Sequence, residues 1–186
     1  MSRLWLLRHA QPLIEPGICY GRLDVEADAA ATLLAARQMH RALPVRCVLR
    51  HSPLRRCLQL ARALQELRPD SRLHPDTRLQ EMDFGSWEGK AWDAIGPVAV
   101  GEWAGQLAHH APGGGESLAA MLERVGQALD DARAQAQGGI DIAWITHAGV
   151  ARCAQWLLDH GKALPGSDQW TLAAPAPGGW MWRQLA

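Results

Sequence analysis

The sequence predicts an α/β protein built around buried, parallel strands. Residues 4–7 and 140–146 are apolar runs of strand length. Continuous runs of this kind are typical of strands that are covered on both faces in a parallel sheet. Segments with apolar residues at helical spacing lie between them. The chain of 186 residues is expected to form one domain, residues 1–186, because this length supports one substantial core.

The composition excludes several classes of protein. Lys and Arg total 19, as do Asp and Glu, so the formal net charge is zero. This argues against a general binder of nucleic acid or of membrane surfaces. No apolar run is long enough to span a membrane or to form a signal peptide. The four cysteines are widely spaced, so we expect reduced thiols in a cytoplasmic protein, with neither a zinc site nor a disulfide framework.

The first strand, residues 4–7, ends at Arg8-His9. Ligands of open α/β sheets bind at the carboxyl ends of the strands. A cation beside a possible nucleophile or base is a candidate anion site there. The loop that follows, from residue 11 to about residue 28, is long for a compact domain, and such loops are often functional. Arg22 in this loop is a candidate ligand contact, with a solvated arginine as the alternative.

Two helices are expected between residues 28 and 67. The first begins at its N-cap Asp28 and carries Leu33, Ala36 and Leu43 roughly at helical spacing, on the face expected to pack against the core. The second begins at Ser52, as N-cap, with Pro53 at the first helical position. Strands are expected beside these helices at residues 45–49 and 71–74.

Arg55 and Arg56 fall in the first turn of the second helix. Positive charge at that end interacts unfavourably with the helix dipole. The position of these two residues therefore indicates a functional role for at least one of them. Arg side chains and the free N–H groups of a helix start together bind phosphate well. We assign Arg55 to solvent and keep Arg56 as a candidate.

Residues 79–89 form a loop that holds three carboxylates among apolar and aromatic neighbours. Such neighbours remove water from a carboxyl group and favour its neutral form, which suits a general acid. Ordinary solvated acids are the alternative. The Gly-rich segment at residues 112–117 lacks the Lys-Ser/Thr of a P-loop, and His109-His110 has no Cys or carboxylate at ligand spacing. Neither segment therefore indicates a nucleotide or metal site.

The remaining elements complete the alternation of helices and strands. Short helices are expected within residues 90–110, and the tail at residues 169–184 is expected to form two strands. The strand at residues 140–146 ends at His147, before a helix, which repeats the geometry of His9. Arg152 in that helix is expected to be structural. The helix from Ser117 to about Gln137 carries a core stripe of Leu118, Met121, Leu122, Val125 and Leu129.

These segments together supply the groups of a phosphoryl-transfer site. Strand ends and helix starts offer Arg8-His9, Arg56 and His147, and the acidic loop offers Glu81. In such a site the Arg pair and one His hold the phosphoryl oxygens, the other His attacks, and the carboxylic acid protonates the leaving group.

At these positions the sequence resembles the histidine phosphatase superfamily, also called phosphoglycerate mutase-like. The acidic loop and the His-Ala-Gly stretch look most like the alpha-ribazole phosphatase branch. The order and spacing of six motifs carry the resemblance: Arg8-His9-Ala10, Gly21-Arg22-Leu23-Asp24, Ser52-Pro53-Leu54-Arg55-Arg56, Glu81-Met82-Asp83-Phe84-Gly85-Ser86-Trp87-Glu88-Gly89, Gly114-Gly115-Glu116-Ser117 and Thr146-His147-Ala148-Gly149-Val150.

The resemblance implies a three-layer α/β/α fold with a mostly parallel, mixed sheet. It also implies a phosphomonoesterase that requires no metal or other cofactor and acts on a small phosphorylated metabolite, with alpha-ribazole 5'-phosphate as one candidate. His9 would become phosphohistidine, Arg8, Arg56 and His147 would form the phosphate pocket, and Glu81 would donate the proton.

The same resemblance bears on the choice of acid and on further site residues. The acid phosphatase branch carries its acid directly after the second His, where this chain has Ala148. This supports Glu81 as the acid, with Asp83 or Glu116 as fallbacks. Arg22 and Glu116 are expected to contact the substrate. The protein is expected to be a monomer or a homodimer.

The sequence also departs from the family pattern. Ala10 stands where the family usually has Gly, Gln11-Pro12 where it has Glu-Thr, and Leu60 where a Thr is common. An Asn that often contacts phosphate is not evident. These departures keep open a non-catalytic module that binds a phosphate ligand. A mutase-type phosphotransferase is a second alternative, although such mutases usually carry longer insertions around the cleft.

Overall fold

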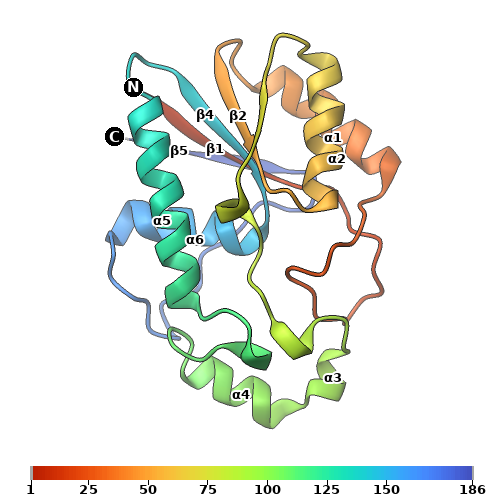
Figure 1. Ribbon diagram of the computed structural model, residues 1–186, viewed down its shortest axis with the longest axis vertical. Helices are drawn as coiled ribbons and strands as arrows, with labels where there is room; N and C mark the ends of the chain where they lie inside the picture. Colours follow the sequence, from red (N-terminus) through yellow and green to blue (C-terminus); the bar gives the residue numbers. More distant parts are fainter. Residues whose placement is uncertain (1, 186) are drawn as a thin grey trace.

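Five strands form one mixed sheet in the order β3-β2-β4-β1-β5 (Figure 1). The structure is a computed structural model and describes residues 2–185. The strands β1 to β4 run parallel, and β5 pairs antiparallel with β1 at the edge. The predicted α/β class and mostly parallel sheet are confirmed. The strands are β1 (Arg3–Arg8), β2 (Cys47–His51), β3 (Leu73–Pro75), β4 (Asp141–Thr146) and β5 (Trp180–Gln184).

The register of the two central strands brings two histidines to the same edge of the sheet. β4 is buried along its whole length, and its last residue Thr146 pairs with Arg8 at the end of β1. The backbone N–H of His9 donates to the carbonyl of Thr146 at 3.2 Å, which extends the pairing by one residue. His9 and His147 therefore leave neighbouring parallel strands side by side.

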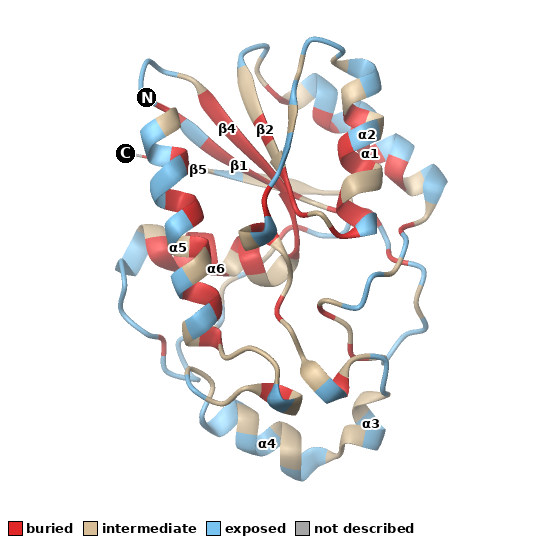
Figure 2. Cartoon of the chain, in the orientation of Figure 1, coloured by how far each residue is buried: buried red, intermediate tan, exposed pale blue. Residues whose placement is uncertain are grey.

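Helices cover both faces of the sheet. Leu4 and Leu6 of β1 pack on the side of α5 (Leu118–Gln135) and α6 (Ala148–His160). Trp5 and Leu7 alternate with them and pack on the side of α1 (Ala29–Ala42) and α2 (Arg55–Leu67). Figure 2 shows the buried residues along the sheet and on the facing sides of these helices. The three-layer α/β/α arrangement is confirmed.

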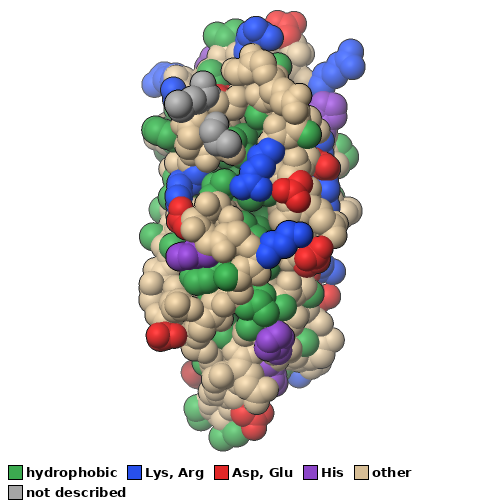
Figure 3. Space-filling model, turned by 90° about the vertical axis from the view of Figure 1, so that its left-hand side faces the viewer, with side chains coloured by type: hydrophobic (Ala, Val, Ile, Leu, Met, Phe, Trp, Pro, Cys, Tyr) green, Lys and Arg blue, Asp and Glu red, His purple; other side chains and the backbone are tan. Residues whose placement is uncertain are grey.

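The surface carries charges of both signs. On the face that lies at the left of Figure 1, basic and acidic side chains are interspersed with apolar ones (Figure 3), in keeping with the zero net charge. None of the helices within residues 2–185 has the length and apolar character needed to cross a membrane.

Short helices lie beyond the carboxyl ends of the strands, at the bottom of Figure 1. They confirm the expectation for residues 90–110 and comprise α3 (Trp92–Ile95) and α4 (Pro97–Gly105). Single 3-10 turns span Thr77–Leu79, Gly85–Trp87 and Pro112–Gly114. Four aromatic rings join these segments, with centroids 5.6 to 6.3 Å apart in the contacting pairs: Phe84, Trp87, Trp92 and Trp103.

The Gly-rich segment packs against the acidic loop. Gly113 has a φ of +61°, and a Cβ atom there would lie 2.2 Å from the carbonyl oxygen of Phe84. The N–H of Glu116 donates to the carbonyl of Asp83 at 2.8 Å. Glycine is therefore required where the two backbones touch, and this contact holds the acidic loop in place.

Of the two predicted N-caps, Asp28 is confirmed and Ser52 is wrong. The side chains of Asp28 and Ser117 cap α1 and α5, and the predicted core stripe of α5 is buried. Ser52 is not the N-cap of α2, which begins at Arg55 after Leu54 without a side-chain cap. Its hydroxyl accepts from the N–H of Leu54 at 3.3 Å and is also available to the site described below.

The predicted core face of α1 is wrong at Leu33, which is 48% exposed. Ala36 and Leu43 of the predicted face are buried as expected, and Ala35 and Met39 join them in the core that the helix shares with α2. Small alanine side chains let two helices approach closely, so the alanine face packs inward. Val45 is 94% exposed, and the second strand accordingly starts at Cys47.

The tail contains one strand rather than the two predicted over residues 169–184. Pro175 and Pro177 lack the N–H that a strand ladder needs. The segment crosses the ends of the strands instead. The Pro175 carbonyl accepts a bond from Arg8 at 3.0 Å, and the N–H of Gly178 donates to the carbonyl of His9 at 2.9 Å.

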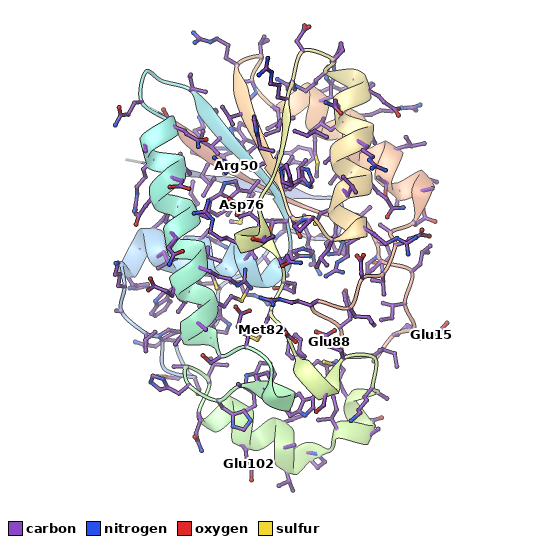
Figure 4. The ribbon with its side chains drawn as sticks, viewed as in Figure 1. Glu15, Arg50, Asp76, Met82, Glu88 and Glu102 are labelled. Atoms are coloured by element: carbon purple, nitrogen blue, oxygen red, sulfur yellow. The ribbon has the colours of Figure 1, made fainter. Side chains whose placement is uncertain are left out.

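Glu88 connects two loops that are distant in sequence. Its carboxylate accepts four backbone N–H bonds of 2.9 to 3.0 Å, from Gly21, Arg22, Leu23 and Phe84. These donors occupy both oxygens, so the conformation of residues 21–23 depends on this one side chain. Figure 4 places Glu88 inside the outline of the molecule and Glu15 at its edge.

We expect Glu88→Gln to lower the free energy of unfolding by about 1–3 kcal/mol. The amide NH₂ would face backbone N–H groups and leave buried donors unsatisfied. Urea denaturation measures the change. Glu15→Gln, in an exposed loop, is the matched control and should stay within about 0.5 kcal/mol of the original protein. Equal stability of the two variants would contradict the role given to Glu88.

Candidate active site

Two imidazole rings meet at the carboxyl ends of β1 and β4. The ring centroids of His9 and His147 are 5.2 Å apart, with the rings tilted by 58°. Both side chains are buried. The strand-end geometry expected from the sequence therefore brings these two residues together.

His9 is arranged as a neutral base or nucleophile. Its Nδ1 lies 2.7 Å from the carbonyl oxygen of Ala10. Because a carbonyl only accepts, the proton resides on Nδ1 and the lone pair on Nε2. Burial, with the positive charges of Arg56 and Arg8 in addition, lowers the pKa of His9 to about 3. The free lone pair is available at neutral pH.

His147 is held by side chains from the start of α2. Its Nε2 lies 2.9 Å from the hydroxyl of Ser52 and 3.4 Å from the Sγ of Cys57. Complete burial, with Arg56 and His9 nearby, lowers the pKa of His147 well below its usual value. Burial raises the pKa of the Cys57 thiol. All three groups are therefore uncharged around neutral pH.

Arg56 is a fully buried cation. Its two terminal nitrogens donate to the carbonyls of Leu23 at 2.9 Å and Gly21 at 2.5 Å, and its guanidinium lies 5.5 Å from the centre of the Tyr20 ring. Its Nε is buried without a hydrogen-bond partner. In the part of the chain that the structure describes, no carboxylate forms an ion pair with it. A buried cation of this kind favours an anion beside it.

Arg8, the neighbour of His9 in the chain, is a half-buried cation. One terminal nitrogen donates to the carbonyl of Pro175, and its Nε is buried without a partner. The two guanidinium groups and His9 line one cavity. The arrangement suits an anion with several oxygens, such as phosphate.

Glu81 faces this cavity from the acidic loop. Its carboxylate accepts from the N–H of Gly149 at 3.0 Å and from that of Met82 at 3.1 Å. A Cβ atom at Gly149 would lie 2.2 Å from Glu81 Oε1, so the carboxyl group rests directly on the first turn of α6. A carboxyl in this position can give a proton to a leaving group or take one from water.

Four predicted site residues do not line the cavity: Arg22, Asp83, Glu116 and the fully buried His147. Arg22 lies 3.6 Å from both Asp83 and Glu116, and Glu116 binds Arg124 through both oxygens at 2.6 and 2.8 Å. Both fallback acids therefore face arginines. This geometry favours Glu81 among the three carboxylates as the acid.

Sequence reasoning missed several residues of the site. Arg124 of α5 donates to the carbonyls of residues 78, 80 and 81 and so fixes the backbone that carries Glu81. Tyr20 and Arg152 line the cavity, although Arg152 was expected to be structural. Arg152 follows Gly149 at helical spacing, so the two residues lie on the same face of α6. This spacing was the sequence signal that could have placed Arg152 in the site.

The cavity has a volume of about 240 Å³ and continues away from the strand ends. Among residues 2–185 there is no group of three or more His, Cys, Asp or Glu that could hold a metal ion. The part of the lining beyond the histidines and arginines is mostly apolar, with Met82, Phe84, Trp103, Leu107, Leu118, Met121 and Trp170.

Comparisons with known proteins agree with this geometry. A mycobacterial glucosyl-3-phosphoglycerate phosphatase is 26% identical, with 97% of this chain and 89% of that chain covered and a TM-score of 0.82. A protein from Thermus thermophilus is also 26% identical, with 98% and 93% covered and a TM-score of 0.71. A candidate alpha-ribazole-5'-P phosphatase from Escherichia coli K-12 is 21% identical, with 97% and 89% covered and a TM-score of 0.80, and shows the fold alone.

No curated protein gives a significant match to the chain. The family model described as histidine phosphatase superfamily (branch 1) matches residues 4–175, which is nearly the whole chain. The chain therefore belongs to the histidine phosphatase superfamily, branch 1, and is a phosphoric monoester hydrolase.

Proposed function

We propose that the protein hydrolyses small phosphomonoesters through a phosphohistidine formed on His9. The observation that carries the proposal is the neutral imidazole of His9 between two guanidinium groups with unpartnered buried donors. A phosphoryl group would satisfy those donors and would place its phosphorus beside Nε2. The mycobacterial relative has been solved with inorganic phosphate and with VO3, which supports the use of these ligands as probes.

The proposed reaction has two steps. In the first, Nε2 of His9 bonds to phosphorus while the bond from phosphorus to the ester oxygen breaks, and protonated Glu81 gives its proton to the leaving alcohol. In the second, the Glu81 carboxylate takes a proton from water, which attacks phosphorus and releases inorganic phosphate from His9. Arg8, Arg56 and His147 hold the other phosphoryl oxygens, so one pocket stabilises both transition states.

Alpha-ribazole 5'-phosphate is the finer proposal for the substrate. It rests on the resemblance of the acidic loop and of the stretch His147-Ala148-Gly149 to that branch. We propose a cytoplasmic location, because the wide spacing of the four cysteines in the sequence indicates reduced thiols.

We expect His9→Ala to reduce the hydrolysis of p-nitrophenyl phosphate by on the order of 10³-fold or more, because the attacking atom is lost. The original protein should keep its rate in the presence of a chelator. His40→Ala, on the exposed side of α1, is the matched control and should keep full activity. A His9→Ala variant with the original rate would rule out the phosphohistidine.

Arg55 and Arg56 form a natural matched pair. Arg56→Lys keeps the positive charge but loses the planar guanidinium, whose several N–H donors can bind the two carbonyls and phosphate at the same time. We therefore expect kcat/KM to fall by about 10²-fold. Inhibition by inorganic phosphate should weaken in parallel. Arg55 is exposed and pairs with Glu26, so Arg55→Lys should change neither quantity by more than about twofold. Similar losses in both variants would argue against a special role for Arg56.

The neutral His9 also predicts a pH dependence of stability. Below about pH 6.5 the unfolded chain binds a proton at this residue, whereas the folded protein does so only near pH 3. The free energy of unfolding therefore falls as the pH drops through this window. Between pH 7 and pH 5, His9 contributes about 2 kcal/mol of that fall, at about 1.4 kcal/mol per pH unit.

Chemical denaturation at the two pH values measures this contribution. In His9→Asn, the loss of free energy of unfolding between pH 7 and pH 5 should be smaller by about 2 kcal/mol. In His40→Asn, at an exposed position, that loss should be unchanged. An unchanged fall in His9→Asn would mean that His9 is protonated in the folded state.

A further inference from the structure

The cavity is divided between a polar end and an apolar end. Arg8, His9 and Arg56 lie at the polar end, at the ends of the strands. The apolar end is built from segments that do not supply the phosphate-binding groups, including α4 and the turn after it, the first turns of α5, and Trp170. Met82, labelled in Figure 4, lies between the strand ends above and helices α3 and α4 below.

Aromatic packing makes one wall of the apolar end rigid. The Trp103 ring lines the cavity and stacks on Trp92, with centroids 6.3 Å apart and an angle of 10° between the rings. Phe84 meets Trp103 edge-on at 5.6 Å. On the other side, Trp170 is supported by Trp156 at 6.0 Å. Flat surfaces that are held in place before binding lose little freedom when a flat ligand contacts them.

We propose that the apolar end binds the leaving group of the substrate and selects phosphomonoesters whose alcohol carries an apolar planar ring over those of bare sugars and polyols. This inference rests on the proposed function, because it assigns the alcohol half of the same ester. An apolar ring buried there gains from removal of its surface from water. The rigid aromatic wall adds a favourable contact to the face of a planar ring.

The apolar end offers few hydrogen-bond partners to a bare sugar or polyol. Arg152 lines the cavity, and its Nε already donates to the carbonyl of Leu172 at 2.9 Å. The terminal nitrogens of Arg152 and the Nε1 of Trp103, which is buried without a partner, remain to bind acceptors on a ring-bearing leaving group. A sugar or polyol brings several hydroxyl groups, and most of them would be buried without partners, which opposes binding.

Two esters of primary alcohols test the preference, because their leaving groups have similar chemistry. We expect kcat/KM for 2-phenylethyl phosphate to exceed that for glucose 6-phosphate by on the order of tenfold or more. Using a primary alcohol in both esters separates recognition of the ring from the intrinsic reactivity of aryl phosphates. Equal values, or a preference for the sugar phosphate, would overturn the proposal.

A matched pair of substitutions locates the preference in the cavity. Leu107→Asn places an amide in the apolar lining and should lower kcat/KM for 2-phenylethyl phosphate by on the order of tenfold, with a much smaller change for glycerol 1-phosphate. Leu164→Asn makes the same change at an exposed residue outside this cavity and should alter neither value. Equal losses on both esters in Leu107→Asn would indicate general damage to the protein and contradict the assignment.

A binding measurement separates failure of this inference from failure of the proposed function. Calorimetry compares 3-phenylpropylphosphonate, which cannot be hydrolysed, with methylphosphonate. Tighter binding of the phenyl compound by on the order of tenfold supports the apolar site, even if no phosphate ester is turned over and the proposed hydrolysis fails. Equal binding of the two phosphonates would refute the apolar site in an active enzyme as well as in an inactive one.

Discussion

The structure depends on how it accommodates one buried cation, the guanidinium of Arg56. Burial of a charge is unfavourable unless dipoles or an opposite charge surround it. Here two backbone carbonyls and the ring of Tyr20 provide part of that environment. The carbonyls belong to residues 21–23, whose N–H groups are bound by the carboxylate of Glu88. A negative charge thus acts on Arg56 through the peptide groups between them, and the guanidinium remains free to meet an anion.

The acid is placed by a second set of contacts, which Glu88 and Arg22 link to the first. Glu81 rests on the start of α6 because Gly149 has no side chain, while Arg124 of α5 binds the carbonyls of the segment that leads to it. The Gly-rich segment touches the acidic loop from the opposite side. Three elements therefore fix one carboxyl group. The nucleophile, by contrast, needs only the register of β1 against β4, because it follows the strand directly.

The features that the sequence predicted correctly are those that short-range patterns of residues determine. The buried strands, the N-cap of α1, the core stripe of α5, and the positions of His9 and His147 at strand ends all follow from short stretches of chain. The errors arose where contacts with segments that are distant in the sequence determine the structure. Leu33 is exposed because the alanine face of α1 fits against α2, and Ser52 serves His147 rather than the helix start. Arg124 resembles any surface residue of an amphipathic helix, since only its contact with carbonyls more than forty residues away distinguishes it.

The thiol of Cys57 has a consequence for the chemical durability of the site. It is fully buried against His147, and its raised pKa keeps it protonated. Oxidants react with thiolates that are exposed to solvent, and this sulfur is neither ionised nor accessible. A site that attacks with imidazole and shields its neighbouring sulfur is insulated from peroxide and from disulfide exchange. Oxidation of Cys57 therefore offers no direct route for switching this site off.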